Sequence, residues 1–258
     1  MRTTLIEAVV ILVLVYFPGH FLGAGLARKG DGLAESLLLR LACCTAVATP
    51  VLLVLALLGS FEIAFVLISF GVCAGLAWLI LRKRERYMQA GWWDLVVLGV
   101  VAGGLALYAH PAEYVLKDRD PGVYTTVAAK LARTGELISY DPLVAAVSSF
   151  HSLEYGTKHP GFYILGEDMI APQFFPGPFL WMGLGDLIGG EWGFFYVVPV
   201  FGAIPLGSAF MLGEELFGRC AGLVGAALLA VGYTQVWWSR YPSSEVITQF
   251  LSLPGYGP

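Results

Sequence analysis

The chain has 258 residues, of which 57% are hydrophobic and 13% are charged, and its formal net charge is -4. Soluble domains usually carry about a quarter charged residues, so water is not the main solvent of this chain. The small net charge and the lack of a basic patch in the sequence argue against nucleic acid as a partner.

Several apolar stretches approach or reach the roughly 20 residues that a helix needs to cross a bilayer. The charge-free ones cover residues 41–58, 63–81, 95–109, 192–213 and 220–239. Two further candidates are residues 8–27, interrupted by Pro18, and residues 169–185, which contain three prolines. Proline is tolerated in a span when neighbouring helices or water satisfy the freed carbonyl groups. We therefore predict an all-α fold, a polytopic transmembrane helix bundle of about seven spans.

Residues 2–27 also fit a secretory signal peptide, because Arg2 precedes the apolar run. The run is long and has no clean cleavage site with small residues. These two features favour an uncleaved first span.

Basic residues indicate how the bundle is oriented. Arg28-Lys29 follows the first predicted span and a cluster at 82–86 follows the third, and short basic loops tend to stay cytoplasmic. Residues 110–173 then form an extracytoplasmic loop of a multi-pass cell-membrane protein. By the same count of spans, Arg240 and Glu245 are cytoplasmic. The chain divides into a three-span segment, residues 1–91, and a module with the loop, residues 92–258.

The polar side chains concentrate in this loop. Residues 110–168 hold eight of the nineteen acidic residues and three of the four histidines. In a membrane protein such a concentration is the first place to look for a functional site, although an outward loop can also be plain solvated surface.

One helix is predicted within the loop. Asp120 is expected at its N-cap, Pro121 at its first helical position, and Gly135 just after its end. Between them apolar residues recur every four positions: Val123, Val127 and Leu131. This pattern predicts a short amphipathic helix along the membrane surface, with its apolar side toward the lipid. Residues 141–173 are rich in Gly, Pro and aromatic residues and are expected to be irregular.

The stretch from Lys117 to Tyr124, followed by Ala128-Ala129-Lys130-Leu131-Ala132 and Gly135, resembles a known family. It is similar to the first extracytoplasmic loop of the polyprenyl-phosphate-sugar-dependent glycosyltransferases with the GT-C membrane fold. That family includes the protein mannosyltransferases and the lipid A aminoarabinose transferase. Its members open a juxtamembrane helix with an acidic residue, and a tyrosine often stands four positions on, as Asp120 and Tyr124 do here.

Two more pieces carry the resemblance. Lys158-His159-Pro160 resembles a Lys-Pro-Pro stretch that contacts the lipid phosphate, and residues 175–240 are similar to the succeeding helices of the fold. The resemblance covers about residues 90–252. A three-span segment precedes the span that leads into the acidic loop here, whereas the family usually has the loop after its first span, and family members continue through many further helices. We therefore interpret the chain as an N-terminal portion of the fold.

The resemblance implies an inverting transfer of a sugar from a polyprenyl-phosphate donor to an extracytoplasmic acceptor. Asp120 is the expected catalytic base, and Asp118 supports it or helps to hold a divalent cation such as Mg²⁺ or Mn²⁺. The expected substrate-binding residues are Lys158, His159 and Arg119, which would face the donor phosphate, and Tyr124. The implied partners are the polyprenyl-phosphate-linked sugar and membrane lipid.

Each of these residues also has a purely structural interpretation. Asp120 fits an ordinary helix N-cap, a role worth about 1 kcal/mol that can coexist with catalysis through the other oxygen. Asp118 fits a solvated loop acid and Lys158 a surface lysine. The alternative function is a non-catalytic membrane scaffold or a transporter subunit. A transporter should place ionisable residues inside its spans, whereas Arg40 and Glu62 are predicted to lie close to span ends.

Overall fold

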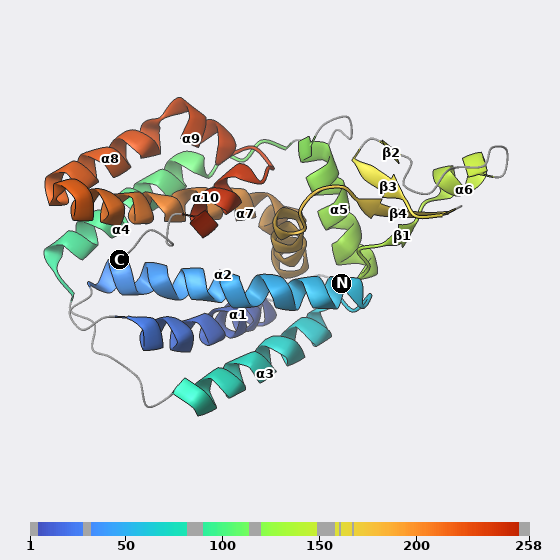
Figure 1. Ribbon diagram of the computed structural model, residues 1–258, viewed down its shortest axis with the longest axis horizontal. Coiled ribbons are helices and arrows are strands. Elements are labelled where there is room, and N and C mark those ends of the chain that lie inside the picture. The colour runs from blue at the N-terminus through green and yellow to red at the C-terminus, as the bar shows by residue number, and fades with distance from the viewer. Residues whose placement is uncertain are drawn as a thin grey trace.

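The fold was examined in a computed structural model, which describes residues 5–27, 32–81, 90–113, 120–148, 158–159, 161–166 and 168–252. Within these residues the chain is mainly helical, with one small antiparallel sheet (Figure 1). The mainly helical fold predicted from the sequence is therefore confirmed, and the sheet is an addition to it.

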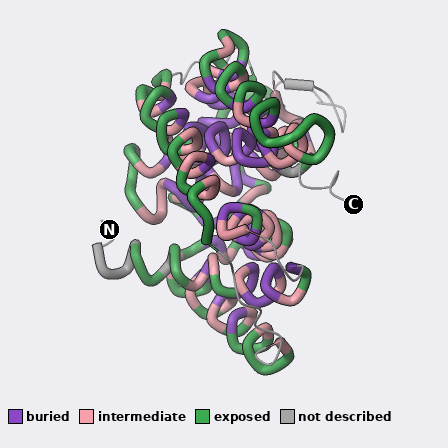
Figure 2. The backbone as a smooth tube through the Cα atoms, turned by 90° about the vertical axis from the view of Figure 1, so that its left-hand side faces the viewer, coloured by how far each residue is buried: buried purple, intermediate pink, exposed green. Residues whose placement is uncertain are grey.

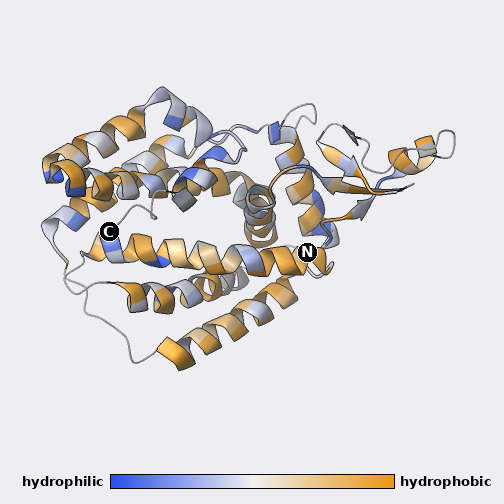
Figure 3. Cartoon of the chain, in the orientation of Figure 1, coloured by the Kyte–Doolittle hydropathy of each residue, from blue (hydrophilic) through white to orange (hydrophobic). Residues whose placement is uncertain are grey.

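Three helices are long and apolar enough to cross a membrane: α2 (Leu33–Leu57), α3 (Ile63–Leu81) and the Trp192–Phe217 part of α7 (Gly177–Phe217). Shorter apolar helices lie within α1 (Leu5–Leu26) and form α4 (Trp92–Tyr108) and α8 (Arg219–Val231). Figure 3 shows hydrophobic residues along these helices, most continuously on α3. Three candidate spans support a membrane protein, and any further span stays a prediction.

Two predicted spans have a different structure. Residues 169–185 are not a span, because residues 169–172 form strand β4 and α7 begins only at Gly177. The stretch 220–239 is divided at Gly232 into α8 and the short α9 (Tyr233–Trp238). Gly232 has extended backbone angles, φ -60° and ψ 130°, which interrupt the helix.

α7 bends sharply at Gly190, where φ is 61° and ψ is -150°. This region of backbone conformation is essentially restricted to glycine. The two arms approach closely at Gly185 and Gly193, where a β-carbon on either residue would lie within 2.6 Å of the carbonyl oxygen of the other. Glycine at these positions therefore permits a first arm, residues 177–189, that turns away from the second.

The helix starts are tied together at one end of the bundle. The Asp94 carboxylate accepts hydrogen bonds from the backbone amides of Gly91 at 2.6 Å and Ala34 at 2.8 Å. One carboxylate thus joins the first turns of α2 and α4, where it also complements the positive ends of the helix dipoles. These helices start at the same end of the molecule and run in the same direction (Figure 1).

The main core lies where the long apolar helices meet two shorter helices. It combines α2, α3 and α7 with α5 (Asp120–Thr134) and α10 (Glu245–Ser252), as shown by Phe70, Leu131 and Phe250, all at most 1% exposed. Figure 2 shows that the buried backbone concentrates between the helices, while their outer sides are exposed. The outer sides of a membrane bundle are apolar because lipid covers them.

Residues 139–172 are more regular than expected. Strands β1 (Ser139–Tyr140), β2 (Lys158–His159), β3 (Phe162–Ile164) and β4 (Met169–Pro172) form an antiparallel sheet in the order β1-β4-β3-β2. Helix α6 (Pro142–Ser148) follows β1 and is capped by Asp141, whose carboxylate accepts hydrogen bonds from the amides of Leu143 and Val144. Ile164, Ile170 and Val144 form a small core beneath the sheet. The prediction of an irregular segment at 141–173 was therefore wrong for the part that the structure describes, and residues 149–157, 160 and 167 lie outside it.

Candidate functional site

The site is built around α5, the helix predicted in the polar loop. It begins at Asp120, and Gly135 follows it with φ +76°, so the predicted extent is confirmed. Val123, Val127 and Leu131 are buried, as their spacing predicted. The prediction that this apolar side faces the lipid was wrong, because α5 packs against α7 and the main core.

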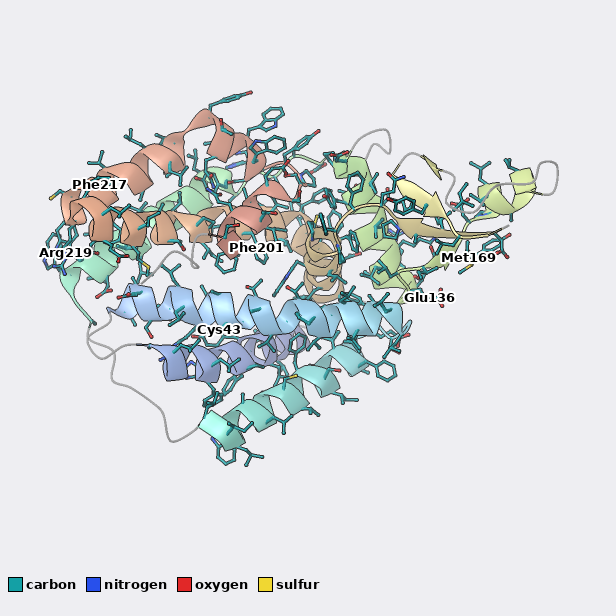
Figure 4. The ribbon with its side chains drawn as sticks, in the orientation of Figure 1. Cys43, Glu136, Met169, Phe201, Phe217 and Arg219 are labelled. Carbon is teal, nitrogen blue, oxygen red and sulfur yellow. The ribbon has the colours of Figure 1, made fainter. Side chains whose placement is uncertain are left out.

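Backbone hydrogen bonds place α5 across the ends of α2 and α3 (Figure 1). The amide of Phe61, in the connection between those helices, donates to the Gly135 carbonyl at 3.2 Å, and the amide of Leu137 donates to the Ala56 carbonyl at 3.1 Å. This is the end of the bundle opposite the Asp94 cap. Figure 4 shows the same two ends, with Glu136 and Met169 at one end of the molecule and Phe217 and Arg219 at the other.

Asp120 and Tyr124 lie one turn apart on α5, as the sequence predicted, but in different environments. Asp120 is exposed and Tyr124 is 5% exposed. The Tyr124 ring lies 5.2 Å from that of Phe174, and its hydroxyl shares a hydrogen bond with the side chain of Ser244. Burial raises the pKa of Tyr124 above its ordinary value, the hydrogen bond with Ser244 lowers it in part, and the charges of Glu245 and Asp120 raise it again. Tyr124 is therefore held as a neutral hydroxyl beside two acids.

The hairpin that carries Lys158 and His159 packs on the first turn of α5. The hairpin turns at Gly161, where φ is +82°, and a β-carbon there would lie 2.2 Å from a methyl carbon of Val123. Gln173 holds this turn, since its amide donates to the Gly161 carbonyl at 3.0 Å and its side chain donates to the Phe162 carbonyl at 3.2 Å. The backbone of the Lys-His pair and the start of α5 are thereby brought together.

Several predicted site residues fall wholly or partly outside the described residues. Asp118 and Arg119 lie outside them, and for Lys158 and His159 the structure describes the backbone of β2 alone. Their roles toward a phosphate or a cation stay predictions. Among the residues that the structure does describe, no group of three or more His, Cys, Asp or Glu side chains is arranged to hold a metal ion.

The segment 240–245 contributes residues that the sequence reasoning assigned to the opposite side. The Ala112 amide donates to the Arg240 carbonyl at 2.7 Å, and the Arg240 guanidinium donates to the Leu107 carbonyl. Arg240 thus lies at the start of the polar loop, and Ser244 and Glu245 lie beside Tyr124. The prediction that Arg240 and Glu245 are on the other side of the bundle was wrong. It counted residues 169–185 as a span, and removing one span from the count reverses the side of everything after it.

Two buried polar atoms in this segment have no hydrogen-bond partner among the described residues. They are Nε of Arg240 and Oγ of Ser243, and the Ser243 residue is 3% exposed. Buried polar groups are usually hydrogen-bonded, so each unpaired one calls for an explanation. We refer to six residues, two at the start of α5 and four in the 240–245 segment, as the Asp120 cluster: Asp120, Tyr124, Arg240, Ser243, Ser244 and Glu245. Tyr124 joins the two groups through its interactions with Ser244 and Glu245.

The Asp120 cluster combines three kinds of chemistry at one end of an apolar bundle. An exposed carboxylate can accept a proton, a guanidinium can neutralise a phosphate, and hydroxyl groups can orient a sugar. Searches against family models, curated proteins and solved structures found no match for this chain. The functional interpretation therefore rests on this geometry and on the sequence motifs.

Proposed function

We propose that the chain is the membrane-embedded part of a glycosyltransferase that takes a sugar from a polyprenyl-phosphate donor. The observation that carries the proposal is the meeting of three segments at one end of the apolar bundle. These are the start of α5 with Asp120, the hairpin with Lys158 and His159, and the segment with Arg240. They combine an acid and cations where an amphiphilic donor would present its headgroup.

The donor chemistry fits such a set of residues. A polyprenyl phosphate leaves as a phosphate monoester, so its departure needs charge neutralisation more than a proton from a general acid. The acceptor oxygen attacks the anomeric carbon, the bond from that carbon to the phosphate oxygen breaks, and the acceptor proton passes to Asp120. This single displacement inverts the anomeric configuration.

Arg240 joins the residues proposed from the sequence. Its guanidinium is anchored by the Leu107 carbonyl, which leaves Nε as a further donor. In the proposed site Arg240 and Lys158 neutralise the donor phosphate. Tyr124, which is held neutral, keeps α5 in contact with the 240–245 segment. A divalent cation at Asp118 and Asp120 stays part of the proposal.

Replacing Asp120 by Asn tests the proposal. Crude membrane vesicles from cells that produce the full chain, which also supply the acceptor, would be incubated with radiolabelled polyprenyl-phosphate sugars, and release of polyprenyl phosphate would be followed by chromatography. Loss of a general base typically lowers the rate by about 10²- to 10⁴-fold, so Asp120→Asn should reduce donor turnover by at least about a hundredfold.

Glu136→Gln is the matched control, because Glu136 is an exposed carboxylate just beyond the other end of α5. This variant should keep wild-type turnover. Equal turnover by Asp120→Asn and Glu136→Gln would remove Asp120 from catalysis. A wild-type chain that turns over no donor would favour the non-catalytic scaffold.

A further inference from the structure

A second polar cluster lies inside the bundle, away from the Asp120 cluster. Arg40 on α2 is 5% exposed, and its Nε donates to the Ser36 hydroxyl at 3.2 Å. Its Nη1 lies 2.7 Å from Nδ1 of His20 on α1, and the Tyr16 hydroxyl lies 3.5 Å from the same Nδ1. A histidine nitrogen that accepts a hydrogen bond from arginine is unprotonated, so these contacts are all to neutral groups.

The charge of Arg40 is therefore uncompensated within the part of the chain that the structure describes. The ion pair found there joins Arg219 and Glu214 at the surface. Nη2 of Arg40 also has no hydrogen-bond partner among the described residues. A buried guanidinium is normally paired with an anion, because burial of an unpaired charge is costly.

An apolar cavity of about 200 Å³ adjoins this cluster. Its walls come from α1, α2, α4 and α7, and half-buried residues among them bring it to the surface of the bundle: Tyr16, Leu37, Leu41, Leu98, Val101 and Ile204. Leu37 and Leu41 flank Arg40 along α2, and Tyr16 belongs both to the cavity wall and to the polar cluster. Apolar cavities of about 150 Å³ already stay dry and accept hydrocarbon ligands.

We propose that Arg40 and this cavity form a binding site for an anionic phospholipid. The lipid phosphate would accept hydrogen bonds from the guanidinium, and part of one acyl chain would occupy the cavity. Arg40 is the eighth residue of α2, which places it roughly 10 Å along the helix from its start at 1.5 Å per residue. The cavity residues of α2 are Ala34, Leu37, Leu38 and Leu41, so the cavity lies beside Arg40 and toward the start of the helix.

A lipid explains these features better than a small anion does. The walls of the cavity are apolar, and the cavity reaches the surface of helices that are long and apolar enough to lie in a membrane. Arginine binds phosphate through two parallel N–H donors, which suits the free Nη2 donor group. The sequence placed Arg40 near a span end, whereas the structure buries it within α2.

Native mass spectrometry of the purified full chain tests this proposal. The chain would be mixed with equal amounts of phosphatidylglycerol and phosphatidylcholine that carry identical acyl chains. The wild type should retain at least about tenfold more phosphatidylglycerol than phosphatidylcholine, which is the ratio expected from one charge-assisted hydrogen bond. Arg40→Met should lose the preference, whereas Arg219→Met, at an exposed arginine on α8, should keep it.

Val101→Phe provides a second variant in case Arg40→Met does not fold. The added ring would fill the cavity, so retention of both lipids should fall while Arg40 is unchanged. Equal retention of the two lipids by the wild type, or an unaltered preference in a folded Arg40→Met chain, would overturn the proposal. Displacement of the lipid by millimolar inorganic phosphate would also overturn it, in favour of a small-anion site.

Discussion

Tyr124 connects the helix that begins at Asp120 with the distant segment that carries Ser244 and Glu245. Its ring packs on Phe174, so the hydroxyl is withdrawn from solvent while its neighbours Asp120 and Glu245 are exposed. Removing a phenol from water disfavours the phenolate, and two nearby carboxylates add to that effect. A single buried hydroxyl therefore makes the polar end of the protein sensitive to alkaline pH.

The raised pKa of Tyr124 predicts how stability depends on pH. Below about pH 10, the ordinary tyrosine pKa, Tyr124 is protonated in both the folded and the unfolded chain. Above that pH the unfolded chain releases the proton while the folded chain retains it, so stability falls until the pH passes the folded pKa. The melting temperature of the wild type should therefore drop more between pH 8 and about pH 10.5 than that of Tyr124→Phe.

The comparison of these two chains isolates one residue, because the other eleven of the twelve tyrosines are common to both. Equal drops in the two chains would mean that Tyr124 is not held neutral by its surroundings. A second check is Ser244→Ala, which removes the hydrogen bond that lowers the pKa of Tyr124 and so should steepen the alkaline drop.

For single residues, local patterns in the sequence predicted the structure of α5, whereas contacts between residues far apart in the sequence were not predicted. The start at Asp120, the stripe of Val123, Val127 and Leu131, and the stop at Gly135 depend on neighbours within one or two turns. Arg240, Ser244 and Glu245 enter the site through contacts that span much of the chain, such as the bond from Arg240 to Leu107 across 133 residues. No local pattern encodes such a contact.

At the scale of elements, the bend in α7 decides which residues reach the polar end. Its first arm packs with α5 and the main core, where Phe179, Leu180 and Met182 are fully buried. Its second arm is one of the three helices that can cross a membrane. The bend at Gly190 therefore separates a part that supports the site from a part that spans.

Gly190→Ala should destabilise the chain. The backbone angles of Gly190 are strained for any residue with a β-carbon, at a cost of about 1–3 kcal/mol. Gly189→Ala is a close control, because its φ is not positive and a β-carbon there would meet open space. Thermal unfolding in detergent should show a lower melting temperature for Gly190→Ala alone. Equal melting temperatures would mean that α7 can straighten at this point.

The wrong assignment of residues 169–185 as a span has a clear physical cause. Residues 169–185 are apolar enough to suggest a span, but Pro172, Pro176 and Pro178 interrupt helix formation. β4 ends at Pro172, and α7 begins immediately after Pro176, with Pro178 in its first turn. Hydropathy alone favoured a span, and the spacing of the prolines was the signal that could have excluded it. The sheet was missed because its strands are two to four residues long.

For the whole molecule, the two ends differ in chemistry. The Asp94 cap and the surface pair Arg219–Glu214 lie at one end, and α5, the sheet and the 240–245 segment lie at the other. The sequence predicted apolar helices, of which three are long enough to cross a membrane, while the extracytoplasmic position of the polar loop stays a prediction. It could not predict which side residues 240–245 occupy, because that depends on the parity of every preceding span.

Cysteine labelling in a membrane can check this arrangement. Single cysteines at the exposed positions 136, 245 and 219 would be introduced after replacing Cys43, Cys44, Cys73 and Cys220 by alanine. A membrane-impermeant maleimide should modify positions 136 and 245 from the same side and position 219 from the other. If position 245 reacted together with 219, the contact of the 240–245 segment with Tyr124 would be contradicted.

The long-range contacts of the Asp120 cluster also constrain the order of assembly during synthesis. When α5 leaves the ribosome, Leu107, Ala112 and Tyr124 lack their partners, because Arg240 and Ser244 have not yet been made. Contacts between residues far apart in sequence form late, since closing a long loop has an entropic cost. The catalytic end proposed here would thus mature only after residues 240–245 have been made, so a chain released before that point would carry Asp120 without the segment that contacts Tyr124.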